Sequence, residues 1–313
     1  MDRVSILMSI YNESEMHIRE SLDSLLSQTW ENFELIIVID NPQRNDIEKI
    51  LTSYNDDRIK IIYNKANIGL AESMNIALRS ATGLFIARMD ADDVAKEDRI
   101  EKELSILKTG QYDIVCSNYI YIDEQSKVLN RKCTTYTNKQ LIKFLPYSNT
   151  LHHPTVMMTR NSILKVNGYR NFPCSQDYDL WLRLMENGSK FYIINEPLLK
   201  YRVRDNSITE SNSFKQIATI RYIKRLYRER RSKGFDSYSI MNYNRYIETL
   251  KLNDEKYLAK CQYFKKIKDK ITIIKSTNKV HACFLMAYLF FCSDFYRRLY
   301  IDNVFELARR SLV

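Results

Sequence analysis

The sequence predicts an α/β fold, with a mostly parallel, Rossmann-like sheet followed by a helical C-terminal appendage. Two observations lead to this fold class. Over residues 4–89, short runs of apolar residues alternate with helical patterns, and the runs are continuously apolar, as in strands buried on both faces. From about residue 214 onward the pattern becomes helical and rich in lysine and arginine.

The N-terminal elements follow one another in βα order. We expect strands at residues 4–11, 33–39, 59–63 and 84–89, and helices at about 14–27, 46–53 and 70–81. The second half is less regular, with expected strands at 113–122, 127–133, 154–159, 191–194 and 198–203 and a helix at 177–186. Parallel sheets bind ligands at the carboxyl ends of their strands. Asp40 and Asp90 directly follow the second and fourth strands, so we expect both at that edge.

The basic character of the chain belongs to its last third. The net charge is +10 over 313 residues, and residues 214–313 alone hold 22 lysines and arginines against 9 acidic residues. Such an appendage suits an anionic surface, for example phospholipid headgroups, nucleic acid or a ligand with a pyrophosphate group. We expect a main domain over residues 1–212 and a basic helical region over 213–313.

The cysteines and the N-terminus indicate the cellular compartment. The six cysteines are scattered without a CxxC pair, which fits free thiols in a reducing environment. The first thirty residues lack a basic segment followed by an apolar one, so no signal peptide is predicted. We expect a cytoplasmic protein.

The acidic turn Asp90-Ala91-Asp92-Asp93 closes the fourth expected strand. Carboxylates this close repel one another and need a cation or hydrogen-bond donors to offset that cost. A hard divalent ion held by one or two carboxylates, phosphate oxygens and water suits such a turn. The alternative is a plain surface turn in which Asp93 caps a helix beginning near Lys96. The position at the end of a parallel strand favours the metal site.

Two further segments follow expected strands. Asp40 is either a turn residue beside Asn41 or a carboxylate that accepts hydrogen bonds from a base or ribose. The stretch around Asn67 and Gly69 opens a helix. Gly69 is either a simple helix entry or a position where a nucleotide approaches the backbone closely.

A second acidic pair, Asp177 and Asp179, lies near the start of an expected helix. These residues are either capping charges favoured by the helix dipole or include a general base for an acceptor hydroxyl. The adjacent His152 and His153 should point to opposite sides of an extended chain. We therefore expect a structural role for at least one of them, and not joint metal ligation.

Seven motifs in order resemble the bacterial inverting glycosyltransferases of family two, which have the GT-A fold. The resemblance extends from Val4 to about Thr209. The motifs are Val4 to Glu13, Asn67 to Ala71, Met89 to Asp93, His153 to Thr155, Gly168 to Arg170, Gln176 to Trp181 and Tyr201 to Val203.

The resemblance implies how a nucleotide sugar is bound. Tyr11 and Glu13 would lie along the nucleotide, with Asn67 and Gly69 also at the donor, and Asp40 would face the uracil ring.

The resemblance also implies the residues of the reaction itself. Asp90 would lie at the ribose and sugar, and Asp92 would ligate Mn²⁺ or Mg²⁺ that bridges the diphosphate. Asp177 would be the catalytic base that deprotonates the acceptor hydroxyl, and a single displacement would invert the anomeric carbon.

Three positions depart from the family pattern. Gln176 replaces the usual Glu before the base, although Asp177 itself is kept. Arg204 stands where many relatives have His; an arginine cannot ligate a metal, but it can bind a diphosphate. Asn41-Pro42 replaces the usual small residues after the second strand, so the contacts there are open.

The apolar stretch from Ala282 to Cys292 is too short to span a bilayer, which needs ~20 residues. It is either a helix buried against the main domain or an interfacial helix. Arginines follow it at 297, 298, 309 and 310 among Tyr, Phe and Leu, as in a helix lying in anionic headgroups. We expect peripheral attachment to the inner face of the cell membrane, where a lipid-diphosphate-linked acceptor would be found.

The function predicted from these features is transfer of a hexose from a UDP-sugar to a lipid-linked or growing surface glycan, such as O-antigen, lipopolysaccharide or capsule. One alternative is a metal-dependent nucleotidyl- or phosphotransferase, but the chain has no GxxxxGK[ST] loop and no second acidic cluster. Another is a non-catalytic nucleic-acid-binding protein. The near-neutral first two thirds and the lack of a binding motif disfavour it, so no nucleic-acid partner is expected.

Overall fold

The computed structural model describes residues 2–203, 213–251, 254–274, 279–293 and 296–297. The chain forms two compact units, one ending at Asp236 and the other beginning at Ser237. The predicted functional residues that the structure describes all lie in the first unit.

A nine-stranded sheet forms the centre of the first unit, in the order β3-β2-β1-β4-β8-β6-β9-β5, with β7 paired to β6. The first four strands in this order are parallel: β3 (Ile59–Tyr63), β2 (Phe33–Ile39), β1 (Val4–Ile10) and β4 (Phe85–Arg88). The remaining strands are β8 (Val156–Thr159), β6 (Ile114–Ile122), β9 (Phe191–Arg202), β5 (Val94–Ala95) and β7 (Val128–Lys132). β8 is antiparallel to both β4 and β6, whereas β9 is parallel to β6.

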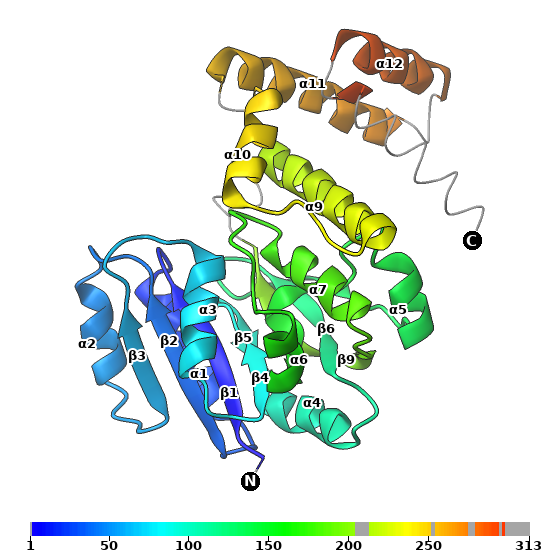
Figure 1. The fold of residues 1–313 in the computed structure, drawn as a ribbon. Coiled ribbons are helices and arrows are strands. Elements are labelled where there is room, and N and C mark those ends of the chain that lie inside the picture. The colour runs from blue at the N-terminus through cyan, green and yellow to red at the C-terminus, as the bar shows by residue number, and fades with distance from the viewer. Residues whose placement is uncertain (1, 204–212, 252–253, 275–278, 294–295, 298–313) are drawn as a thin grey trace. The chain divides into compact units, whose positions relative to one another are not determined.

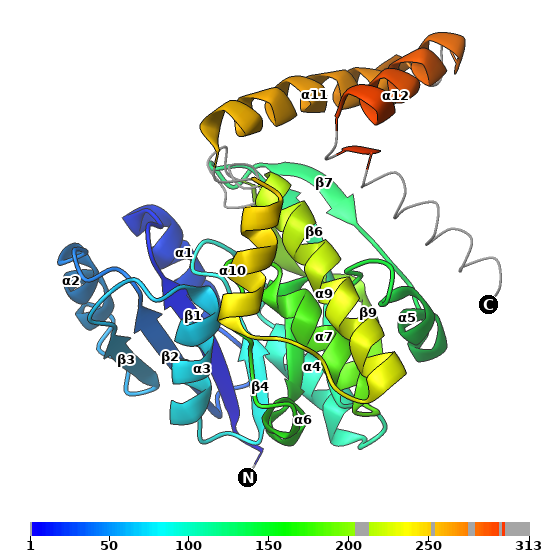
Figure 2. The same ribbon diagram turned by 45° about the horizontal axis from the view of Figure 1, so that its top comes forward.

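Helices cover both faces of the parallel strands (Figures 1 and 2). The helices of this unit are α1 (Glu15–Leu26), α2 (Asp46–Thr52), α3 (Leu70–Ser80), α4 (Arg99–Lys108), α5 (Asn138–Phe144), α6 (Arg160–Lys165), α7 (Gln176–Glu186) and α9 (Ser213–Lys233). Side chains of β1 such as Ile6 and Met8 join one buried cluster with apolar residues of α1, α2 and α4. α3 packs against β1 and β2 from the other face. The mostly apolar composition of β1 and β2 follows from this double coverage, and the buried Ser5 and Glu34 hydrogen-bond to each other.

The α/β prediction is confirmed, and the strand ends expected in the first half agree with the structure within two residues. One difference lies in the second half. The two strands expected at 191–194 and 198–203 are a single strand, β9, which bulges where Pro197 pairs with Asn118. A proline cannot donate to the strand ladder, so the sequence pattern breaks there while the strand continues.

The acidic turn leads into a strand and not directly into a helix. Asp93 precedes β5, which pairs with β9, and α4 begins only at Arg99 with Asp98 as its N-cap residue. Asp93 therefore does not cap a helix.

The basic helix α9 belongs to the first unit, although we expected the main domain to end before it. It packs on α7, where Arg230 donates to Glu186 at 2.6 Å. Arg230 also pairs with Asp236, which Arg170 contacts at 2.7 Å. The compact units therefore divide after Asp236, and the expected boundary at residue 212 falls outside the described residues.

The second unit contains α10 (Ile240–Thr249), α11 (Glu255–Ile274) and α12 (Lys279–Cys292), with α11 packed against α12. In the described part of the chain, no helix is long and apolar enough to cross a membrane.

Candidate active site

The carboxyl ends of β1, β2 and β4 meet at one edge of the sheet, and polar residues follow each of them. Tyr11 follows β1, Asp40 follows β2, and Asp90 comes two residues after the end of β4. This is the placement that the parallel topology predicted.

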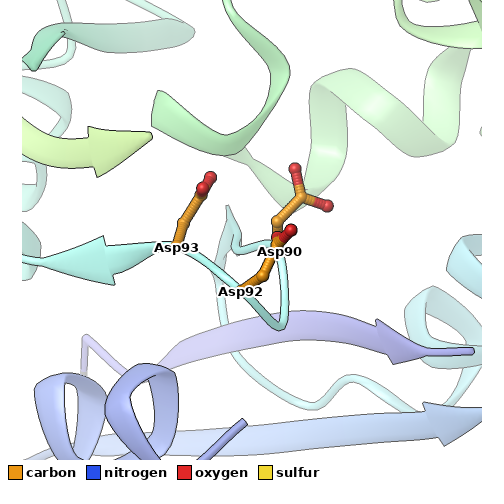
Figure 3. A group of neighbouring side chains, drawn as sticks. All are labelled: Asp90, Asp92 and Asp93. Carbon is orange, nitrogen blue, oxygen red and sulfur yellow. The ribbon is translucent and has the colours of Figure 1, made fainter. Parts of the chain in front are cut away.

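The acidic turn brings three carboxylates together (Figure 3). One ligand oxygen from each of Asp90, Asp92 and Asp93 lies within 4.8 Å of the others. The Asp90 side chain is 31% exposed, whereas Asp92 and Asp93 are buried. Burial, followed by the charges of Asp90 and Asp92, raises the pKa of Asp93 well above its usual range. A cluster of hard oxygen donors that repel one another is suited to a divalent cation such as Mn²⁺ or Mg²⁺.

Arg202, the last residue of β9, holds this turn in place. Its backbone N–H donates to Asp93 Oδ1 at 2.9 Å, and its Nε donates to the Asp92 carbonyl at 2.8 Å. The guanidinium also pairs with Glu20 of α1. Further acceptors lie in the turn between β6 and β7: the Asp123 and Glu124 carbonyls and the Ser126 hydroxyl. The bond from Arg202 gives Asp93 a structural role.

Arg88, the last residue of β4, lies beneath the acidic turn and is only 2% exposed. It forms an ion pair with Asp90. Burial opposes its charge, but the neighbouring Asp90 carboxylate raises the pKa of Arg88. Within the described part of the chain its Nε and Nη1 atoms have no hydrogen-bond partner. A buried guanidinium with two free donor atoms is suited to a further anionic or polar group.

Asp40 is buried and anchors the loop after β3. Its Oδ1 accepts from Asn64 Nδ2 at 2.8 Å and from the Ile68 N–H at 2.9 Å, and its Oδ2 accepts from the Gly69 N–H at 2.9 Å. Gly69 has a φ of +86°, which glycine adopts without strain. Both oxygens of Asp40 thus already accept from the protein, and its contact with a uracil ring stays a prediction.

The remaining predicted donor residues line the same edge. Tyr11 is 40% exposed, and its N–H donates to Glu13 Oε2 at 2.7 Å, which closes the turn after β1. Asn67 is exposed and accepts from the Gly69 N–H at 3.1 Å. Arg204 lies outside the described residues.

The acidic pair on α7 divides into two different roles. Asp177 is half-buried, and its Oδ2 accepts from Asn149 Nδ2 at 2.8 Å. Burial raises the pKa of Asp177, and the Asn149 hydrogen bond opposes that shift. Asp179 is fully buried and accepts from Arg183 Nε at 2.7 Å, a structural ion pair. Of the two, only Asp177 keeps the partial exposure that a general base needs.

The two histidines point to different surroundings, as expected for adjacent residues. His153 is buried, with Nε2 2.8 Å from the Tyr169 hydroxyl. His152 stacks on Tyr119, with ring centroids 4.2 Å apart, and meets the edge of Tyr201. Burial lowers the pKa of His152 to about 4, so its ring is neutral at pH 7. Neither histidine belongs to the carboxylate cluster of the described residues.

Arg88 links the two parts of the site. Its charge stabilises the ionised form of Asp177 and also of Asp93, and it pairs directly with Asp90. The structure thus brings the acidic turn and the α7 carboxylate into one electrostatic environment.

Three residues at this site had no role predicted from the sequence: Arg88, Asn149 and Arg202, the last of which lies in the Tyr201 to Val203 motif. The sequence did contain a signal for the two arginines, since each is a charged residue in an otherwise largely apolar strand. Charged residues are rarely buried in such a strand without a partner. Asn149 lies in a loop and carries no such signal.

Comparisons with known proteins agree with this geometry. Residues 5–168 match the family described as Glycosyl transferase family 2. The chain is 33% identical over 216 residues to the O-antigen biosynthesis glycosyltransferase WbnJ of Escherichia coli, covering 67% of this chain and 84% of the relative. It is 32% identical over 221 residues to the Escherichia coli UDP-Glc:alpha-D-GlcNAc-diphosphoundecaprenol beta-1,3-glucosyltransferase WfgD, covering 68% and 82%. Among solved structures, residues 1–349 of Staphylococcus aureus TarS in complex with UDP-GlcNAc superpose with a TM-score of 0.57 at 18% identity, over 71% of this chain and 66% of that one.

Replacing Arg202 with Lys should destabilise the protein and loosen the acidic turn. A lysine cannot reproduce the fork of donors that joins Asp92, Glu20 and the β6–β7 turn, so buried acceptors lose their partners. We expect a loss of about 2–3 kcal/mol in the free energy of unfolding, measured by chemical denaturation. Arg131→Lys, at an exposed arginine on β7, is the matched control and should change it by no more than ~0.5 kcal/mol. Equal effects of the two substitutions would contradict the role of Arg202.

Proposed function

Since the chain belongs to glycosyl transferase family 2, we propose that it is a metal-dependent, inverting hexosyltransferase that uses a UDP-sugar donor and a surface-glycan acceptor. The resemblance seen in the motifs and the expected GT-A fold are confirmed, and the family match supports glycosyl transfer over the nucleotidyltransferase and nucleic-acid-binding alternatives. The observation that carries the proposal is that Arg88 pairs with Asp90 and also acts on the charge of Asp177. This electrostatic link supports a donor-binding cluster and a base that act at one site.

The donor is proposed to bind along the carboxyl edge of the parallel strands. Asp92, aided by Asp90, would hold Mn²⁺ or Mg²⁺, since carboxylate oxygens at this separation suit either ion. The bound ion would neutralise charge on the departing diphosphate. The binding of UDP-GlcNAc by TarS, which shares the fold, supports a uridine-diphosphate donor.

The nucleotide is proposed to lie against the loops after β1, β2 and β3. Tyr11 and Glu13 would border it on one side, and Asn67 and Gly69 on the other. Asp40 would contribute chiefly by fixing the 67–69 loop, through its bonds to the Ile68 and Gly69 amides. Arg204 is proposed to bind the diphosphate.

Asp177 is proposed to act as the base. It would take the proton from the acceptor hydroxyl as that oxygen bonds to the anomeric carbon. The bond from the anomeric carbon to the diphosphate oxygen breaks in the same displacement, and UDP leaves with the electron pair. Attack opposite the leaving group inverts the configuration. Asn149 would orient the Asp177 carboxylate, and Arg88 would keep it ionised despite its burial.

The relatives indicate the kind of acceptor. WbnJ is named for O-antigen biosynthesis, and the name of WfgD specifies a sugar linked to diphosphoundecaprenol. We propose the same class here, a glycan on a lipid diphosphate, used from the inner face of the cell membrane.

Turnover with nucleotide sugars tests the proposal. In the presence of Mn²⁺ the wild-type protein should slowly release nucleoside diphosphate from one UDP-sugar of a panel. Asp177→Asn should lower transfer by roughly 10²–10⁴-fold, because the base is lost. Its dissociation constant for UDP with Mn²⁺, measured by calorimetry, should stay close to the wild-type value.

The control is Asp57→Asn, which removes an exposed carboxylate at the amino end of β3. It should leave both turnover and UDP binding unchanged. Full turnover by Asp177→Asn would remove Asp177 from its role, and lack of UDP binding by the wild type would remove the donor assignment.

The pH dependence of transfer should reveal the contact between Asn149 and Asp177. The Asn149 amide donates to the ionised carboxylate and so lowers the pKa of Asp177, against the effect of burial. In Asn149→Ala this pKa rises further, so the base is protonated over a wider acidic range. We expect the acid limb of the plot of kcat/KM against pH to move to higher pH. The loss of kcat/KM relative to the wild type should be smallest in alkaline solution. Asn130→Ala, at an exposed asparagine of β7, should leave the limb in place, and an unmoved limb in Asn149→Ala would contradict the contact.

We also propose peripheral membrane attachment through α12. Four large apolar side chains follow one another at helical spacing and are exposed: Val280, Phe284, Tyr288 and Phe291. They form one face of the helix. The last third of the chain is strongly basic, which complements anionic lipid headgroups. Within the second unit this apolar face of α12 is left uncovered, which supports an interfacial role.

Flotation with liposomes tests the attachment. The full chain should float with vesicles of phosphatidylglycerol and phosphatidylethanolamine, and less so at high salt. The double substitution Phe284→Ser with Phe291→Ser should lower binding more than tenfold, since each inserted phenylalanine contributes roughly 1.5–3 kcal/mol. Phe235→Ser removes a phenylalanine of similar exposure outside α12 and is the matched control. Equal flotation of the double variant and the control would refute the role of α12.

A further inference from the structure

A cavity of about 210 Å³ lies beside the proposed base. Its lining comes from β6 and β9 of the sheet, from the segment after β7, and from the loop that follows α5. We propose that this cavity is the subsite for one neutral sugar ring of the acceptor. The inference rests on the proposed glycosyltransferase reaction and extends it to the acceptor.

The cavity has a fixed wall. Cys116 pairs in register with Ile193, so the two side chains share one face of the sheet, and both line the cavity. Asn118, which is 2% exposed, accepts from the Thr134 N–H at 2.8 Å and from its hydroxyl at 3.3 Å. This pair of hydrogen bonds holds the segment after β7 over the cavity. The cavity is therefore bounded by strands β6 and β9 and by the segment after β7, and not by surface side chains alone.

Two lining residues connect the cavity to the reaction site. Asn149 lines it and donates to Asp177. His152 also lines it and lies within electrostatic reach of Arg88 and Asp90. A ring held in the cavity would thus have the Asp177 carboxylate next to one of its walls, where an acceptor hydroxyl has to lose its proton.

Unused polar atoms point to a ligand. His152 Nε2 and Thr150 Oγ1 are buried and have no hydrogen-bond partner among the described residues. Buried polar atoms are nearly always paired with protein or water, so two such atoms around one cavity indicate groups that bond to something held there. The neutral imidazole of His152 offers either a donor or an acceptor, which suits a hydroxyl group.

The lining selects a neutral polyol over a charged ligand. It contains hydroxyl, amide, imidazole and aromatic groups, and none of its residues is Asp, Glu, Lys or Arg. A diphosphate or a nucleotide would find no countercharge in such a space. The volume of about 210 Å³ leaves room for a sugar ring. Tyr136 supplies an aromatic surface for the apolar side of the ring.

A cavity-filling substitution tests the inference. Thr134→Tyr places a large side chain in the cavity, while its backbone N–H still donates to Asn118. Thr135→Tyr makes the same change on the next residue, which is exposed and does not line the cavity. The probes are methyl glycosides of glucose, galactose and N-acetylglucosamine. Their binding is measured by saturation-transfer NMR with UDP and Mn²⁺ present, and circular dichroism verifies that both variants are folded.

We expect at least one glycoside to bind the wild type and Thr135→Tyr, and its signal to fall at least tenfold in Thr134→Tyr. UDP binding with Mn²⁺ should be equal in all three proteins, because the donor edge is untouched. Equal glycoside binding by the two variants would overturn the assignment of the cavity. So would a lack of glycoside binding by a wild type that binds UDP. A wild type that does not bind UDP would instead contradict the proposed donor, which keeps the two failures distinguishable.

Discussion

The site depends on how the fold holds three mutually repelling carboxylates at one edge of the sheet. Arg202 makes this possible because it joins the acidic turn to three separate parts of the chain. Its backbone and side chain bond to Asp93 and Asp92, and its guanidinium reaches Glu20 on α1 and the turn after β6. The cost of assembling the acidic turn is thereby offset in the core of the domain.

Arg88 provides the electrostatic connection between the two halves of the reaction. Buried beneath the turn, it pairs with Asp90 and favours the ionised form of Asp177, which burial alone would disfavour. A positive charge near both the acidic turn and Asp177 opposes the effect that burial has on the pKa values of Asp93 and Asp177. Exclusion of water strengthens each of these electrostatic interactions. The burial that shifts the pKa values of the carboxylates therefore also strengthens their attraction to a positive charge.

In the proposed reaction, donor and acceptor bind to different parts of the sheet. The parallel strands β3, β2, β1 and β4 carry the loops assigned to the nucleotide, whereas β6, β9 and α7 surround the cavity and Asp177. Asn75 of α3 ties the parts together, because its amide both donates to and accepts from the backbone of Tyr169 at 2.9 Å.

The sequence by itself determined the α/β class, the parallel arrangement of the first four strands and the edge where Asp40 and Asp90 lie. These features follow from the local sequence. The spacing of apolar residues predicts the strands, and the carboxyl ends of parallel strands meet at one edge of the sheet. Only the tertiary structure decided what each carboxylate does. Asp93 and Asp40 are bound by the protein through contacts far apart in the chain, 109 positions in the case of Arg202 and Asp93. The cavity likewise arises from segments that no sequence period relates, which is why its lining could not be predicted.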